Sequence, residues 1–219
     1  MPVNLFTNLT NLLAFASLGA VFALILRNSL SGQAQMFALQ SVLLALLASV
    51  VALYAQSIEL FAVAVALLIV KGGVIPYVLQ RAVKRIGMQP NVSPYLGIVA
   101  TLVISGALII VAYYVMAPIV ASDPLPTASA IPLAFAGILV SLFVTVIRRR
   151  ALTQILGFLM LENSIFLLAL LTTYGVPFIV EIGVFLDVLV AVLIMEVFVY
   201  RIKENFDTLE VGQMGELKG

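Results

Sequence analysis

The sequence contains no cysteine and no histidine. These absences exclude disulfides, thiolate or imidazole metal sites, and iron–sulfur or haem ligation through those side chains. They also exclude catalytic triads and proton transfer by an imidazole. Any redox chemistry that involves this chain is therefore expected on a partner, and no cofactor is expected on the chain itself.

Charged residues are scarce as well. They make up 10% of the 219 residues, whereas 63% are hydrophobic. A soluble domain averages about 25% charged and about 45–50% apolar residues. A chain of this size cannot hide so much apolar surface in a core of its own, so we expect lipid to be its solvent.

Long apolar segments recur along the chain. A bilayer core about 30 Å thick needs roughly 20 apolar residues in a helix. The segments that qualify are Leu5–Leu26, Met36–Tyr54, Ile58–Leu79, Leu96–Met116, Pro132–Ile147, Leu152–Thr173 and Pro177–Tyr200. We therefore predict an all-α integral membrane protein with seven transmembrane helices. The fifth is the shortest and is expected to draw on flanking residues.

The positive charges predict an orientation. Ten of the eleven Lys and Arg residues follow predicted helices 1, 3, 5 and 7: Arg27; Arg81, Lys84 and Arg85; Arg148, Arg149 and Arg150; Arg201, Lys203 and Lys218. Basic residues concentrate in cytoplasmic loops. We therefore predict an external N-terminus and a cytoplasmic C-terminus.

Six ionisable residues lie inside predicted spans, where each is costly. Three of them are near helix ends. Glu59 follows Ser57, which is a good helix cap, and Glu181 follows Pro177, which suits a helix start. Glu196 lies one turn before Arg201 and is as well explained by an interfacial ion pair. These three are secondary candidates for a pathway, together with the amide Asn163.

The other three, Lys71, Glu162 and Asp187, lie deep in their spans. Glu162 and Asp187 are ~15 Å into their helices, and Lys71 is ~20 Å into its own. One interpretation is a pathway for protons or ions, and the other is a buried ion pair that fixes helix packing. Lys71 precedes Gly72, Gly73 and Pro76, which weaken a helix and predict a kink or an adjacent cavity.

The C-terminal part, from about Pro132 to Asn205, resembles the K-type small membrane subunit of respiratory complex I. The resemblance rests on the basic turn RRRALTQ and on the acid-bearing helices ILGFLMLENSIFLLALL and FLDVLVAVLIMEVFVYRIK. The whole chain resembles component E of the hydrogenase-4 and formate hydrogenlyase complexes. Together, these resemblances imply a four-helix unit over residues 1–127, a three-helix unit over 128–205 and a cytoplasmic tail over 206–219.

By this resemblance, Glu162 and Asp187 correspond to the acids of the second and third K-type helices. The implied function is that of a non-catalytic membrane subunit in a hydrogenase-type complex, coupling electron transfer to proton or sodium movement. Antiporter-like membrane subunits and a soluble hydrogenase arm would be its partners, and the soluble arm would hold the nickel–iron centre and the iron–sulfur clusters. The resemblance also implies the cytoplasmic membrane of a bacterium or archaeon. Three alternatives remain: a scaffold in the same complex, a subunit of a multisubunit cation/proton antiporter, and a freestanding transporter, for which the chain shows no clear inverted repeat.

Overall fold

The computed structural model describes residues 1–27, 29–86, 95–122, 125–149 and 151–174. This part is helical, and six of its helices are long and apolar enough to cross a membrane. The helices are α1 (Val3–Leu26), α2 (Leu30–Ala55), α3 (Ile58–Ile69), α4 (Ile75–Ile86), α5 (Ile98–Ser122), α6 (Ile131–Ile147) and α7 (Ala151–Thr173). A π-helical segment, Val70–Val74, joins α3 to α4 in one continuous rod. The predicted seventh span, Pro177–Tyr200, lies outside the described residues.

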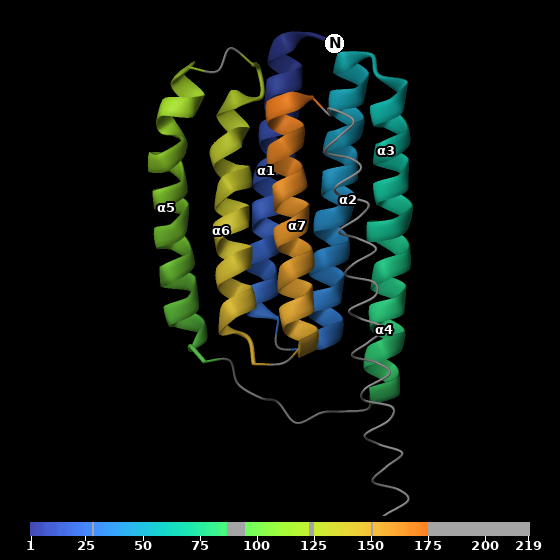
Figure 1. Cartoon of the computed structure of the whole chain (residues 1–219), viewed down its shortest axis with the longest axis vertical. Helices are drawn as coiled ribbons and strands as arrows, with labels where there is room; N and C mark the ends of the chain where they lie inside the picture. The colour runs from blue at the N-terminus through green and yellow to red at the C-terminus, as the bar shows by residue number, and fades with distance from the viewer. Residues whose placement is uncertain (28, 87–94, 123–124, 150, 175–219) are drawn as a thin grey trace, which may run out of the picture.

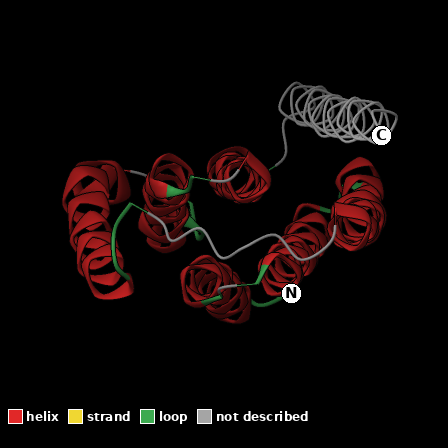
Figure 2. Ribbon diagram, turned by 90° about the horizontal axis from the view of Figure 1, so that it is seen from below, coloured by secondary structure: helices red, strands yellow, loops and turns green. Residues whose placement is uncertain are grey.

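The helices stand side by side along one direction, and consecutive rods run antiparallel (Figure 1). Two hairpins, α1–α2 and α6–α7, pack against each other through α1 with α6 and α2 with α7. Helix α5 flanks α6 on one side, and the α3–α4 rod flanks α2 on the other (Figure 2). The bundle interior between the two hairpins therefore receives side chains from four helices.

Five of the six described spans begin within two residues of the sequence prediction, but α2 does not. It begins at Leu30, six residues before the predicted Met36. The Ser29 hydroxyl accepts a hydrogen bond from the Gly32 amide, and Gln33 Nε2 donates to the Arg27 carbonyl at 2.7 Å. The polar start of α2 is thus satisfied locally, which apolarity alone did not indicate. Ahead of α6, a 3-10 turn at Ala128–Ala130 lengthens the short fifth span, as expected.

The turns between α1 and α2 and between α6 and α7 repeat one another. Arg27 and Arg148 each follow the last residue of a helix in an extended conformation. Gln33 Nε2 donates to the Arg27 carbonyl and Gln154 Nε2 to the Arg148 carbonyl, both at 2.7 Å and both six residues apart. The two hairpins run in the same direction (Figure 1), so this repeat is parallel rather than inverted.

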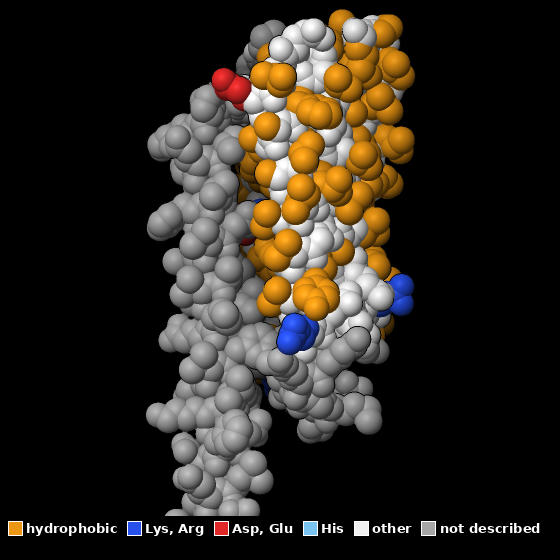
Figure 3. Space-filling view, turned by 90° about the vertical axis from the view of Figure 1, so that its right-hand side faces the viewer, with side chains coloured by type: hydrophobic (Ala, Val, Ile, Leu, Met, Phe, Trp, Pro, Cys, Tyr) orange, Lys and Arg blue, Asp and Glu red, His pale blue; other side chains and the backbone are white. Residues whose placement is uncertain are grey.

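Apolar side chains cover much of the described face of the bundle that Figure 3 shows. The α3 helix alone exposes Ile58, Phe61, Val65, Leu68 and Ile69. Exposed apolar surfaces of this extent mark contact with lipid or with other proteins. Several polar and charged side chains are buried inside the bundle instead, among them Lys71, Glu162 and Asn163.

Candidate functional site

A buried ion pair joins the α3–α4 rod to α7. Lys71 Nζ lies 3.0 Å from Glu162 Oε1, and the two side chains are 2% and 4% exposed. The residues are 91 positions apart in the sequence. Two of the three deep charges predicted from the sequence are therefore in direct contact.

Lys71 lies in the π-helical segment Val70–Val74. The predicted weakness of the helix at Gly72 and Gly73 thus takes the form of a widened turn, and the rod continues into α4. A Cβ added at Gly72 would meet Leu68 and Val42 at an ordinary 3.5 Å. Lack of space for a side chain therefore does not explain the glycines, and the distorted backbone of the π-helical segment explains them better. Single π-helical turns occur frequently at functional sites.

An uncharged polar network lies beside the ion pair, between α2 and α7. Asn163 Nδ2 donates to Gln40 Oε1 at 3.2 Å and to Ser41 Oγ at 3.0 Å. Gln40 Nε2 donates to Ser164 Oγ at 3.3 Å and to the Met160 carbonyl at 3.4 Å. Gln40, Ser41, Asn163 and Ser164 are all at most 1% exposed. Buried polar groups that bond each other in this way fix how two helices are rotated against one another.

The network determines where Glu162 points. Asn163 and Ser164 face α2, and the residue before them, Glu162, is turned toward Lys71. Helix α6 also approaches closely here, because a Cβ added at Gly137 would lie 2.8 Å from Ser164 Oγ. Within the described residues, Asn163 Oδ1 is buried without a donor. That oxygen is an acceptor that a buried water could satisfy.

The remaining predicted site residues are less central or are not described. Glu59 is exposed in the first turn of α3, and Ser57 accepts a hydrogen bond from the Leu60 amide, which confirms the predicted cap. Asp187, Glu181 and Glu196 lie outside the described residues. Among the residues that are described, no cluster of three His, Cys, Asp or Glu side chains could hold a metal ion.

Sequence reasoning missed Gln40 and Ser41. Both are uncharged, so a prediction based on the ionisable residues of the spans does not include them. A usable signal was present, because they form an adjacent polar pair within the predicted apolar span Met36–Tyr54. A glutamine at that depth must find a partner, since an unsatisfied polar group in hydrocarbon costs several kcal/mol.

These features define a protein of multi-pass membrane type with a charged pair in its helical interior. The chain belongs to the same family as the uncharacterized protein Rv0085 of Mycobacterium tuberculosis, with 35% identity over 96% of this chain and 98% of that protein. It is also distantly similar to hydrogenase-4 component E of Escherichia coli and of Shigella flexneri, at 25% identity over 69% of this chain and 70% of those proteins. No protein-family model matches the chain, and neither does any solved structure.

Proposed function

We propose that this chain is a non-catalytic membrane subunit of a hydrogenase-type, energy-converting complex. In this proposal the Lys71–Glu162 pair takes part in moving protons or sodium ions when electrons are transferred elsewhere in the assembly. The relationship to hydrogenase-4 component E supports membership in such a complex. Nickel–iron and iron–sulfur centres would then be held by soluble partners, because this chain has no Cys or His.

The observation that carries the coupling role is the position of the ion pair. Two opposite charges lie 3.0 Å apart, almost fully buried, in the middle of helices long enough to span a bilayer. Charged side chains at such depth are rare and usually mark ion pathways or proton relays. A π-helical turn under Lys71 gives the cation a backbone that can change its hydrogen bonding without unfolding the rod. Asp187 would continue the path on the next helix, as the K-type resemblance implies.

The same ion pair supports a second candidate, a scaffold that holds other membrane subunits in place. Buried pairs can fix helix packing and specify one arrangement, as at single polar positions in coiled coils. A test must therefore neutralise both charges in the same variant, so that neither stays buried without the other.

The double substitution Lys71→Met with Glu162→Gln does this, because both replacements are neutral and similar in length. We expect the complex to assemble, to co-purify with hydrogenase subunits and to transfer electrons to an artificial acceptor at the normal rate. In sealed vesicles its proton or sodium gradient should be lost. Glu59→Gln, which neutralises an exposed acid of the same rod, is the matched control and should leave the gradient intact.

An undiminished gradient in the double variant would exclude the coupling role and favour the scaffold. Failure of the native chain to co-purify with any hydrogenase subunit would instead exclude membership in such a complex.

A further inference from the structure

The two repeated arginine turns leave two buried polar atoms without a partner in the described part of the chain. Arg148 is 8% exposed, its Nη2 donates to the Ile25 carbonyl at 3.3 Å, and its Nε has no acceptor. Gln33 is 1% exposed, its Nε2 donates to the Arg27 carbonyl at 2.7 Å, and its Oε1 has no donor. Ile25 and Arg27 are two residues apart, so both side chains lie against the last turn of α1.

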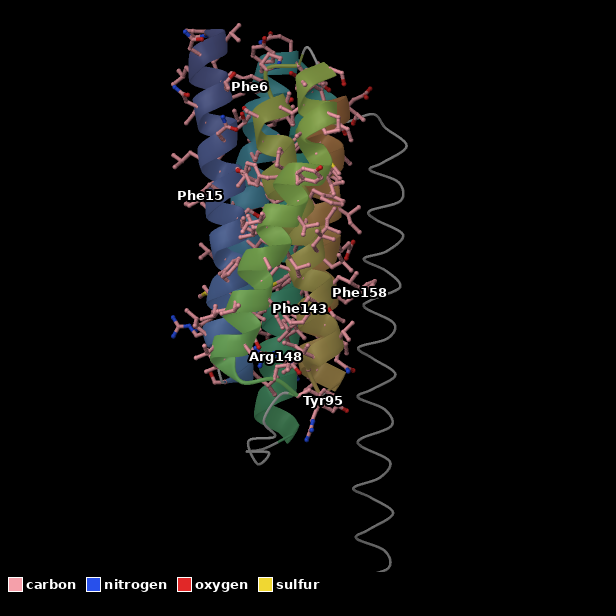
Figure 4. The ribbon with its side chains drawn as sticks, turned by 90° about the vertical axis from the view of Figure 1, so that its left-hand side faces the viewer. Phe6, Phe15, Tyr95, Phe143, Arg148 and Phe158 are labelled. Carbon is pink, nitrogen blue, oxygen red and sulfur yellow. The ribbon has the colours of Figure 1, made fainter. Side chains whose placement is uncertain are left out.

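This end of the bundle is positively charged. Arg27 and Arg149 are exposed beside the buried Arg148, and the Arg149 guanidinium lies 4.1 Å from the centre of the Tyr95 ring. Figure 4 shows Arg148 and Tyr95 at this same end. Of the acids described by the structure, Glu59 begins α3 at the opposite end and Glu162 is in the middle of α7.

The buried charge of Arg148 indicates that an anion binds beside it. Burial lowers the pKa of its guanidinium, but an arginine stays protonated at any physiological pH. The carbonyls at the end of α1 supply only a partial negative charge. A guanidinium has five N–H donors, and among the described residues Arg148 has one carbonyl acceptor for Nη2 and none for its buried Nε. A buried charge in that state is costly unless an oppositely charged group joins it.

We propose that this end of the bundle binds the headgroup of an anionic phospholipid that carries a hydrogen-bond donor beside its phosphate, as phosphatidylglycerol does. The phosphate accepts from Arg148, and a headgroup hydroxyl donates to Gln33 Oε1. The turns lie where the apolar helices end, which is the depth of the headgroups. Guanidinium and phosphate match in geometry, and basic pockets between transmembrane helices bind anionic headgroups. An ionised carboxylate from a partner protein has no donor for Gln33, so it fits this pair of atoms less well.

The proposal does not depend on a role in a hydrogenase complex, and the purified full-length chain tests it. Native mass spectrometry would compare retention of phosphatidylglycerol, phosphatidylethanolamine and phosphatidylcholine offered in equal amounts. Phosphatidylglycerol has both the charge and the donor, whereas phosphatidylcholine has no donor. We expect phosphatidylglycerol to be retained best, and inorganic phosphate in excess not to displace it.

Arg148→Gln should weaken phosphatidylglycerol retention about tenfold or more, because a charge-assisted hydrogen bond is lost. Gln33→Leu should reduce the preference for phosphatidylglycerol while leaving the charge in place. Arg81→Gln is the matched control, since it removes an exposed arginine of α4 at the same end of the bundle. If Arg148→Gln does not fold, Arg148→Lys keeps the charge, removes the Nε donor and should still weaken retention.

Equal retention of phosphatidylglycerol and phosphatidylcholine by the native chain would overturn the proposal and leave water as the partner of both atoms. A loss as large in Arg81→Gln as in Arg148→Gln would also overturn it, because general surface charge would then explain the binding. An unchanged preference in Gln33→Leu would refute the part played by the headgroup donor. Displacement by inorganic phosphate would identify a free anion rather than a lipid as the ligand.

Discussion

Neutralising one member of the Lys71–Glu162 pair should destabilise the protein far more than neutralising both. The two side chains are 2% and 4% exposed and 3.0 Å apart, so Glu162→Gln leaves a buried ammonium without this carboxylate. Removing one partner of a buried pair costs ~3–5 kcal/mol. That loss corresponds to a roughly 10²- to 10⁴-fold shift toward the unfolded state. Lys71→Met should cost a similar amount, because it removes the ammonium that lies 3.0 Å from the buried Glu162 Oε1.

The double variant should behave differently. Replacing a buried ion pair by neutral side chains of similar volume is often neutral or stabilising. We therefore expect Lys71→Met with Glu162→Gln to unfold within about 1 kcal/mol of the native chain. The coupling energy of the cycle would then exceed the ~0.5–3 kcal/mol usual for contacting residues.

Denaturation of the full-length chain by sodium dodecyl sulfate in mixed micelles, followed by circular dichroism, measures these free energies. The native chain, both single variants and the double variant complete the cycle. Two results would refute the reasoning: single variants that each cost under about 1 kcal/mol, or a double variant whose loss equals the sum of the two. Either result would mean that the attraction between Lys71 and Glu162 contributes little to the free energy of unfolding, because water in the site compensates each charge.

Three further outcomes are expected. Gly157→Ala should destabilise the chain by ~1–3 kcal/mol in the same denaturation assay, because the new Cβ would lie 2.5 Å from Thr145 Oγ1 and 3.1 Å from the Thr145 Cα. Gly19→Ala is the control and should be neutral or stabilising, because its Cβ would have nothing within 4 Å. A cysteine at Ser122 should react in whole cells with a membrane-impermeant thiol reagent and one at Gln89 should not; the reverse pattern would invert the predicted orientation. The purified chain should bind no iron or nickel above background by elemental analysis, and stoichiometric metal would contradict the exclusion drawn from its missing Cys and His.

The sequence by itself was sufficient to predict the membrane helices, because the signal for them is local. A bilayer sets the length of an apolar segment, and six of the seven predicted segments coincide with long apolar helices in the described residues. The cap at Ser57 and the irregular helix after Lys71 were also predictable, since both depend on residues within one or two turns. The same local character made Lys71 and Glu162 recognisable as unusual without any knowledge of packing.

Only the tertiary structure decided which of these residues meet. Lys71 and Glu162 are 91 residues apart, and Gln40 and Asn163 are 123 apart. No residue pattern within a single helix therefore predicts either contact. The contacts depend on how α7 is rotated against α2 and on the π-helical turn that presents Lys71. Helices that are apolar all round carry no amphipathic stripe to indicate such a rotation, because lipid and core favour the same side chains. The buried polar side chains fix this rotation instead, because they bond one another only when the assembled bundle brings them into contact.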